Sequence, residues 1–501
     1  MAIIPSKYQK AVYDEIQYGN GNIVVKAVAG SGKTTTIVNA LTLIPKHKRI
    51  LFSAFNNSIV NELKERCPDH VRVTTLHSLG WSSLKKHYGT EIKLSENKSF
   101  IIAEKLFKNV YHRSVRNAHF AVMSKLVGLY KLNLGRTKED LIDIADKHDI
   151  NYTDDLIEQT MMLYSLDFSM KDTFDFNDMI FRPAVENSIF LYKYDYVFVD
   201  ECQDLNLAQQ MLLDKSIKDN GRMISVGDPY QAIYGFAGAD AESFNRLVEK
   251  PNTKVLPLSV CYRCSKSVVE SAKDIVSDLE YFEDSPVGTF RYGLVNEIRT
   301  GDWALCRNVK PLVILCVHLL SEGKKAFIKG SDIGKSIVRL LKGTNETNLG
   351  QALRKLTFSL SKVKNDLSKR GIEDPTSHPK YISLKEKIGI ISYLGKKFKS
   401  VNEIVTFIDR IFSEGGDGIQ LSTIHKSKGL ENDRVFLVCP ELMPSKYATQ
   451  PWQIQQETNL RYVAYTRAKL ELIIVENFNG TVIDFRKELG EEHRLLLEDV
   501  N

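Results

Sequence analysis

Short apolar runs alternate with amphipathic stretches along most of the chain. Five runs in the first half are rich in β-branched and aromatic residues, and each leads into a polar or glycine-containing turn and then a helical pattern. Strands that alternate with helices in this way are typical of a parallel sheet with helices on both faces. The predicted strands are residues 22–28, 49–54, 71–75, 196–199 and 223–226.

A second series of the same kind follows in the C-terminal half. A chain of 501 residues exceeds what one hydrophobic core usually supports, so several domains are expected. The pattern therefore predicts an α/β fold with two parallel-sheet lobes. The predicted strands of the second lobe are residues 303–306, 326–329, 419–423, 434–438 and 471–475.

Each predicted lobe is interrupted by a segment with helical periodicity and few strand signals. The first lobe is expected to comprise residues 1–85 and 172–248, with a helical insertion at 86–171. The second is expected to comprise residues 249–345 and 412–501, with a shorter, Lys-rich helical insertion at 346–411. No internal repeat and no low-complexity tract is evident.

Composition changes this picture little. Hydrophobic residues make up 43% of the chain and charged residues 26%, and the net charge of +6 is too mild to identify a partner. No run approaches the ~20 apolar residues of a membrane helix. Because the start MAIIPSKYQK also lacks an apolar signal region, a cytoplasmic location is expected.

The seven cysteines are scattered instead of being spaced as a disulfide framework, which fits a reducing compartment. Only Cys261 and Cys264 form a CxxC pair. A zinc site would need a second pair of ligands at suitable spacing, which the sequence lacks, so ordinary core cysteines are the favoured interpretation.

A glycine-rich turn follows the first predicted strand. Residues 29–35 read AGSGKTT and lead into a helical run. Gly30 and Gly32 let the backbone curl so that its N–H groups, together with the helix N-terminus, bind phosphates. Lys33 supplies a point charge, and the Thr34 hydroxyl is placed to coordinate Mg²⁺.

The general pattern GxxxxGK[ST] has glycine at position 27, where this chain has alanine, but the anion-binding glycines are intact. The sequence therefore predicts a nucleotide-binding loop. The loop comprises Ala27, Val28, Ala29, Gly30, Ser31, Gly32, Lys33, Thr34 and Thr35.

Two acids end the strand YVFV at residues 196–199. The carboxyl edge of a parallel sheet is where ligands bind in such folds. Asp200 is therefore expected to be the Mg²⁺ partner, and Glu201 the base that orients or deprotonates the attacking water. The second acid favours hydrolysis of ATP over phosphoryl transfer to a small molecule.

Further motifs extend from Gln9 to Arg467. They read PSKYQKAV, AVAGSGKTT, FSAFNNSI, VTTLHSLG, DFNDMI, DECQD, VGDPYQAIYGFAGAD, VCYRCSKSVV, STIHKSKGLENDRVFLV and LRYVAYTRAKLELIIV. With these motifs the chain resembles the UvrD/Rep/PcrA branch of superfamily 1 DNA helicases. In that family alanine is usual at position 27, and Cys261 stands where the family usually has asparagine. The resemblance implies two RecA-like P-loop lobes and a monomer.

The resemblance also implies roles for individual residues. Gln9 would read adenine, Gln231 would sense the γ-phosphate, Tyr262 would stack on adenine, and Glu431 would lie on the ribose side. Arg263 would reach the γ-phosphate and Arg467 would be the arginine finger. The residues implied to contact the nucleic acid strand are Phe55, Asn57, Thr75, His77, Tyr234, Phe236, His425 and Ser427.

The function expected from the resemblance is 3′ to 5′ movement on single-stranded DNA and at junctions with duplex, driven by ATP with Mg²⁺. Stacking of bases on Tyr234 and Phe236 would give grip without sequence preference. A translocase that displaces proteins without unwinding duplexes would share every motif. An ATP-gated binding module stays open, and stacking alone discriminates poorly between DNA and RNA.

Overall fold

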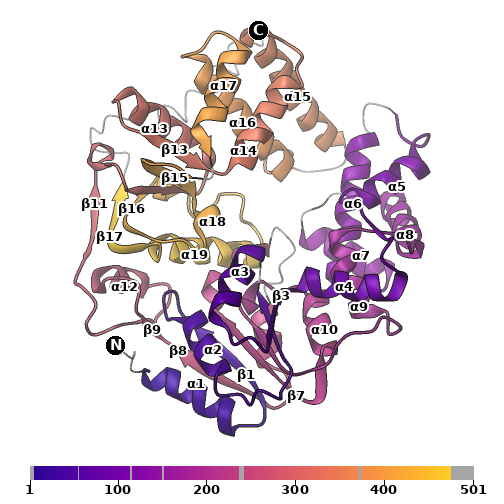
Figure 1. The fold of residues 1–501 in the computed structure, drawn as a ribbon. Helices are drawn as coiled ribbons and strands as arrows, with labels where there is room; N and C mark the ends of the chain where they lie inside the picture. Colours follow the sequence, from indigo (N-terminus) through magenta and orange to yellow (C-terminus); the bar gives the residue numbers. More distant parts are fainter. Residues whose placement is uncertain are drawn as a thin grey trace. The chain divides into compact units, whose positions relative to one another are not determined.

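The computed structural model describes residues 5–54, 56–112, 116–148, 150, 152–235, 242–369, 374–413 and 415–475. The chain divides into two compact units between Ser259 and Val260. Each unit is built around one large parallel sheet (Figure 1). The predicted α/β fold class is confirmed.

The sheet of the first unit has six strands in the order β3-β2-β6-β7-β1-β8, and every neighbouring pair is parallel. Helices cover both faces, because successive strand residues point to opposite sides: Ile23 and Val25 belong to one buried cluster and Val24 to the other. The strands are β1 (Asn22–Ala27), β2 (Ile50–Ala54), β3 (Val71–Thr75), β6 (Tyr194–Val199), β7 (Ile217–Gly227) and β8 (Thr253–Leu258).

One face of this sheet is covered by the first three helices and the other face by four later ones. The first group is α1 (Lys7–Tyr18), α2 (Lys33–Leu41) and α3 (Asn57–Arg66). The second group is α4 (Leu76–Tyr88), α9 (Phe176–Val185), α10 (Leu207–Lys215) and α11 (Ser243–Val248). Two short 3₁₀ turns, η1 (Cys202–Asp204) and η2 (Pro229–Gln231), follow β6 and β7.

Strand β8 differs from the expected boundary. The sequence places residues 249–258 in the second lobe, but Thr253–Leu258 pairs along its whole length with β1 of the first sheet. It is an edge strand with three exposed side chains and contains Pro257. Both features weaken the strand signal in the sequence, because proline is confined to edge strands and the apolar alternation is incomplete.

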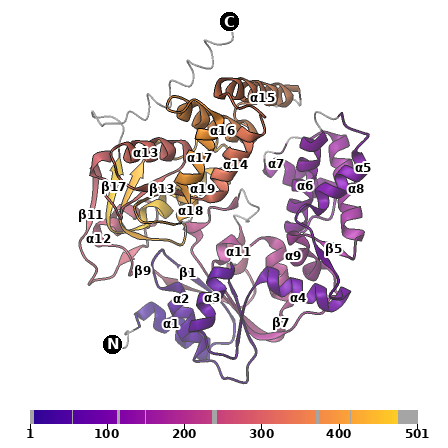
Figure 2. The same ribbon diagram turned by 45° about the horizontal axis from the view of Figure 1, so that its top comes forward.

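In the described parts of residues 95–172, four further helices lie between the short paired strands β4 (Lys93–Leu94) and β5 (Thr173–Phe174). They bury two apolar clusters of their own, apart from the sheet, and stand together beside α9 (Figure 2). These helices are α5 (Lys98–Phe107), α6 (Arg116–Leu132), α7 (Lys138–Lys147) and α8 (Asp154–Ser169).

The sheet of the second unit has seven parallel strands in the order β11-β17-β16-β12-β15-β13-β14. Edge strands β11 and β14 were not expected, since β11 has no buried side chain and β14 is two residues long. The strands are β11 (Thr289–Gly293), β12 (Trp303–Cys306), β13 (Ala326–Lys329), β14 (Phe412–Ser413), β15 (Ile419–Thr423), β16 (Asn432–Val438) and β17 (Ala468–Val475), with β9 (Val260–Cys261) and β10 (Glu280–Tyr281) as a separate pair.

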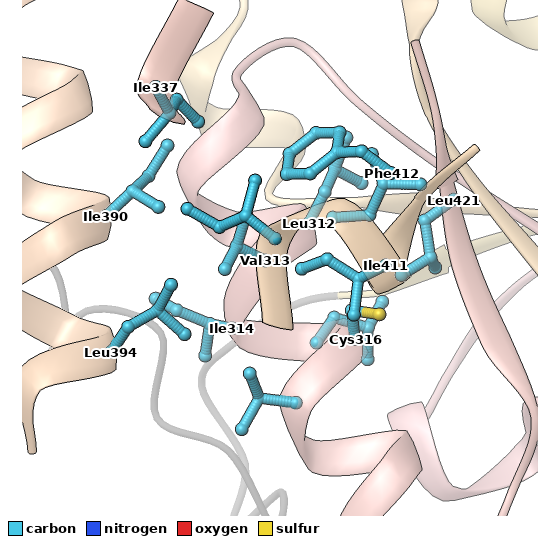
Figure 3. Close-up of a cluster of buried hydrophobic side chains, with 14 of the residues drawn as sticks. Leu312, Val313, Ile314, Cys316, Ile337, Ile390, Leu394, Ile411, Phe412 and Leu421 are labelled. Atoms are coloured by element: carbon cyan, nitrogen blue, oxygen red, sulfur yellow. The ribbon is translucent and has the colours of Figure 1, made fainter. Parts of the chain in front are cut away.

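The helices between residues 309 and 411 share one continuous core with the sheet of the second unit. Figure 3 shows side chains of α13 meeting Ile390 and Leu394 of α16 on one side and Phe412 and Leu421 of the sheet on the other. The helices are α12 (Lys266–Ala272), α13 (Val309–Ser321), α14 (Ser331–Lys342), α15 (Leu349–Lys369), α16 (Pro379–Gly395), α17 (Val401–Ile411), α18 (Ile424–Ser427) and α19 (Pro451–Tyr465), with 3₁₀ turns η4 (Val295–Glu297) and η5 (Pro440–Leu442). Within the described ranges, no helix combines the length and apolarity needed to cross a membrane.

A buried ionic cluster ties α5, α6 and α8 to α9. The Lys131 ammonium lies 2.5 Å from Asp167, 2.8 Å from Asp178 and 3.2 Å from Asp175. Lys98 Nζ lies 2.7 Å from Asp178 and 3.1 Å from Asp167. Burial opposes the charge of Lys131, but the three carboxylates outweigh it and raise its pKa.

We expect Lys131→Met to lower the free energy of unfolding by roughly 3–5 kcal/mol, because it leaves buried carboxylates without their main partner. Lys138→Met is the matched control: Lys138 pairs with Glu158 at 3.2 Å on the surface, and its loss should cost about 1 kcal/mol or less. Urea denaturation followed by circular dichroism measures both. Equal losses in the two variants would contradict the structural role of the cluster.

Candidate functional site

The loop after β1 has the backbone that phosphate binding requires. Gly30 and Gly32 adopt positive φ angles of 67° and 75°, a conformation that costs glycine little. The Ser31 hydroxyl donates to the Val28 carbonyl at 2.8 Å and closes the turn. Gly32 is the N-cap of α2, so the N-terminus of this helix faces the loop.

The acids at the end of β6 meet this loop within the first unit. The Thr34 hydroxyl donates to Asp200 Oδ2 at 3.4 Å, and Lys33 Nζ lies 3.6 Å from Glu201 Oε1. The Glu201 N–H donates to Asp200 Oδ1 at 2.9 Å. Strands β1 and β6 are parallel members of one sheet, so residues that follow them reach the same edge.

Asp200 carries an unfavourable charge in this arrangement. Burial and the neighbouring Glu201 carboxylate raise the pKa of Asp200 to about 6, against the opposing effect of Lys33. A divalent cation would offset this cost, and a hydroxyl beside a carboxylate is a donor set that Mg²⁺ accepts. Thr34 and Asp200 therefore fit the predicted metal role.

Gln9 and Thr35 have additional contacts in the fold. Gln9 Nε2 donates to Thr36 Oγ1 at 3.1 Å, and the Gln9 side chain completes the capping box of α1. It is buried beside the loop, 3.7 Å from the position a Gly32 Cβ would occupy. The Thr35 hydroxyl accepts from Arg66 at 3.2 Å.

In the second unit, three separate segments bring the predicted nucleotide residues together. Arg263 forms an ion pair with Glu431, and the Tyr262 ring lies 5.1 Å from that of Phe282. The Asn432 N–H donates to the Arg467 carbonyl at 3.0 Å. Tyr262, Arg263, Glu431 and Arg467 thus form one group although they are up to 205 positions apart in the sequence.

Comparison with known proteins assigns the family. Residues 8–252 match the UvrD/REP helicase N-terminal domain, and residues 418–475 match the UvrD-like helicase C-terminal domain. The chain belongs to the UvrD-like helicase family. The motif resemblance found in the sequence is therefore confirmed.

Individual relatives of the UvrD-like chain differ in length. The F-box DNA helicase protein 1 of Schizosaccharomyces pombe is 26% identical over 514 residues, which cover 92% of this chain and 56% of that protein. The ATP-dependent DNA helicase Rep of Buchnera aphidicola from Acyrthosiphon pisum is 22% identical, covering 93% of this chain and 94% of that protein. The ATP-dependent DNA helicase PcrA of Bacillus subtilis is 24% identical, covering 53% of this chain and 39% of that protein. The matches thus span about half of the F-box helicase, nearly all of Rep and about two fifths of PcrA.

Two members of the UvrD-like site were missed at the sequence level. Gln203 Nε2 donates to Glu201 Oε2 at 2.5 Å, and Gln203 Oε1 accepts from the Asp228 N–H at 3.0 Å. Asp228 in turn accepts from Gln231 Nε2 at 2.6 Å. Asp228 directly follows β7, so the rule that singled out Asp200 at the end of β6 could have found it, whereas no local pattern marks Gln203.

Asp228 is fully buried, and burial raises its pKa to about 6 although Lys33 opposes the shift. The chain of hydrogen bonds from Glu201 through Gln203 and Asp228 to Gln231 connects the predicted base with the predicted γ-phosphate sensor. Gln231 therefore lies at the same sheet edge as the acids.

The residues of the first unit that are predicted to contact nucleic acid lie at or after the carboxyl ends of β2, β3 and β7. Asn57 is exposed at the start of α3, whereas the Thr75 hydroxyl caps α4 by accepting from the Ser78 N–H at 3.1 Å. His77 is half-buried, and burial lowers its pKa, which favours the neutral ring. Tyr234 is half-buried. Phe55 and Phe236 lie outside the described residues.

Two predicted residues of the second unit are turned inward. The Arg467 side chain is buried and donates to the carbonyls of Val463 at 3.0 Å and Leu430 at 2.8 Å. The Ser427 hydroxyl is buried and donates to the Ile424 carbonyl at 2.8 Å. Their roles stay predictions, and contact with a ligand would require these side chains to exchange partners. His425 is half-buried, and burial, aided by Arg307, lowers its pKa to about 4.

The Cys261 and Cys264 thiols are buried, and the Cys264 N–H lies 3.4 Å from Cys261 Sγ. Among the described residues, the one group of three side chains spaced for metal ligation is Asp167, Asp175 and Asp178, whose charge is offset by Lys98, Lys131 and Arg182. The CxxC pair thus has no further metal ligands within the described part of the chain.

We expect Asp200→Asn to stabilise the ion-free protein at pH 7.5 by roughly 1–3 kcal/mol. A carboxyl whose pKa is raised on folding favours the folded state below pH 4, and this contribution is lost as the pH rises through about 6. The gain should therefore vanish near pH 4. An amide can keep the bond from the Glu201 N–H and donate to Thr34.

Thermal unfolding at a series of pH values, in EDTA, measures this effect. Asp195→Asn is the control of opposite sign: the Arg49 N–H and Lys218 hold the pKa of Asp195 below its usual range despite partial burial, so its loss should destabilise at neutral pH. An Asp200→Asn variant less stable than the parent at pH 7.5 would contradict the raised pKa.

Proposed function

We propose that the chain is an ATP-dependent DNA helicase that moves 3′ to 5′ on single-stranded DNA. The observation that carries the proposal is the meeting of Lys33, Thr34, Asp200 and Glu201 at one sheet edge. Relatives named ATP-dependent DNA helicase, such as Rep and PcrA, support the activity and the substrate. The polarity rests on the family resemblance of residues 226–240.

In the proposed reaction, the loop N–H groups and Lys33 bind the β- and γ-phosphates. Glu201 orients the attacking water and accepts its proton, helped by the Gln203 amide, which fixes the carboxylate. Mg²⁺, when bound through Thr34 and Asp200, would supply charge that offsets the negative phosphates. Lys33 Nζ also lies 3.6 Å from Glu201 Oε1, so both side chains face the same part of the site.

Loss of the γ-phosphate would be sensed through Gln231. Its amide is held by Asp228, which is linked through Gln203 to the catalytic base. Tyr234 follows three residues later and is proposed to stack on a base of the strand. The segment from Gln231 to Tyr234 would thereby couple the state of the nucleotide to binding of the DNA strand.

The second unit is proposed to complete the reaction through its two arginines. Arg263 is held by Glu431, and it would exchange this carboxylate for the γ-phosphate. Arg467 would exchange its bonds with backbone carbonyls for charge that develops in the transition state. We also propose that α5–α8 and α15–α17 act as auxiliary subdomains of the two lobes.

Matched duplexes with a 3′ tail or a 5′ tail test the proposed function. With ATP and Mg²⁺, the wild-type chain should separate the 3′-tailed duplex at least tenfold faster, because it loads on the tail and moves toward the junction. Lys33→Ala is the control and should separate neither duplex, since the phosphates lose their point charge.

Strand-stimulated ATP hydrolysis is measured in parallel. Hydrolysis without unwinding of either duplex would assign the chain to translocases that do not separate strands. Faster unwinding of the 5′-tailed duplex would overturn the polarity, and full activity of Lys33→Ala would overturn the nucleotide site.

A further inference from the structure

The amino-terminal edge of the first sheet carries an aromatic and basic surface that the proposed reaction does not use. Phe190 and Tyr192 precede β6, Arg49 precedes β2, and Arg72 is the second residue of β3. These strands are neighbours in the order β3-β2-β6, so their amino-terminal ends lie side by side. We call Arg49, Arg72, Lys86, Phe190, Tyr192 and Lys193 the amino-edge surface.

The two aromatic rings of this surface are half exposed. Phe190 is 51% and Tyr192 49% accessible, and their centroids lie 5.1 Å apart with the rings edge to face. The Lys86 ammonium lies 3.8 Å from the centroid of Phe190 and 4.8 Å from that of Tyr192. Burying large aromatic rings is energetically favourable, so two adjacent exposed rings indicate a surface that binds a partner.

Positive charge is in excess around the rings. Arg49, Lys86 and Lys193 are exposed, and Arg72 donates to the Tyr194 hydroxyl at 2.9 Å. Burial and the nearby charge of Lys193 lower the pKa of Lys215, so two cations share this part of the surface.

Two acids close to this surface, Asp195 and Glu186, are already engaged. Asp195 accepts from the Arg49 N–H at 2.8 Å and from Lys218 at 2.9 Å. Glu186 accepts from Tyr88 at 2.8 Å and from Arg182 at 3.1 Å. The surplus cations therefore present a field that attracts an anionic ligand.

This surface is separate from the nucleotide site. Thr34, Asp200 and Asp228 lie at the carboxyl ends of the strands, whereas the amino-edge surface lies at the opposite ends. Strands β2 and β6 have 5 and 6 residues, and at about 3.3 Å per residue they separate the two edges by roughly 15–20 Å. One nucleotide cannot touch both.

We propose that the amino-edge surface is a second binding site for single-stranded DNA. Unpaired bases can stack on Phe190 and Tyr192, while the flanking phosphates pair with Lys86, Arg49 and Lys193. A duplex or an acidic peptide would use the cations but would leave the exposed rings without stacking partners, so a single strand fits the combination best. This inference rests on the proposed function and adds a second DNA-binding site at the amino-terminal edge of the sheet, opposite the ATP site.

The double variant Phe190→Ala/Tyr192→Ala tests this proposal. Binding of a fluorescein-labelled oligothymidylate without nucleotide, measured by anisotropy, should weaken roughly fivefold to a hundredfold. Strand-free ATP hydrolysis should be unchanged. Phe358→Ala is the matched control: it removes a ring that is 73% exposed on α15, and it should bind the oligonucleotide like the parent.

A second variant, Arg49→Ala/Lys193→Ala, should reduce the slope of log affinity against log salt by about 1.4, or ~0.7 for each lost phosphate contact. Affinity and salt slope equal to the parent's in both variants would overturn the proposal. A loss confined to duplex, or to an acidic peptide, would assign the surface to that ligand and overturn it equally. If the parent chain binds no single strand, the proposed function fails as well, which distinguishes the two failures.

Discussion

Parallel alignment of β1, β6 and β7 is the constraint on which the site depends. Each strand ends at the same sheet edge, so the loop with Lys33, the pair Asp200 and Glu201, and Asp228 meet although 195 positions separate the first from the last. Strand β1 pairs with both β7 and β8, so the phosphate loop follows a strand that is held on both sides. Apolar layers on both faces of the sheet hold the strands in place, and the polar residues of the site follow the carboxyl ends of those strands.

This convergence has an electrostatic cost. Asp200 and Asp228 are buried with raised pKa values of about 6, close to Glu201, and Lys33 is the cation that opposes both shifts. A site with too much buried negative charge is stabilised by a ligand that brings cations. The ionic cluster around Lys131 shows the contrasting case, in which three buried carboxylates are paired with Lys98, Lys131 and Arg182 of the chain itself. The two clusters lie on the same unit, one within the fold and the other at the proposed nucleotide site.

The sequence was sufficient for the central strands and for the residues that directly follow them. Lys33 and Asp200 could be predicted because a buried strand that ends in a glycine loop or an acid implies its position at the sheet edge. Edge strands β8 and β11 were not predicted, because their exposed side chains, and Pro257 in β8, remove the apolar pattern. The inward orientation of Arg467 and Ser427 could not be predicted either, because a motif specifies residue types and not the carbonyl groups that their side chains bind. The role of Gln203 can be identified only from the structure, in which its side chain forms hydrogen bonds with both Glu201 and Asp228.

We propose that the carboxyl edge of the first sheet hydrolyses ATP and that Glu201 is the base. Single-turnover hydrolysis by Glu201→Gln, with ATP affinity measured on the same preparation, tests it most directly. ATP should still bind within about threefold of the parent affinity, while the rate of hydrolysis should fall roughly 10²- to 10⁴-fold. A variant that hydrolyses bound ATP at the parent rate would contradict it.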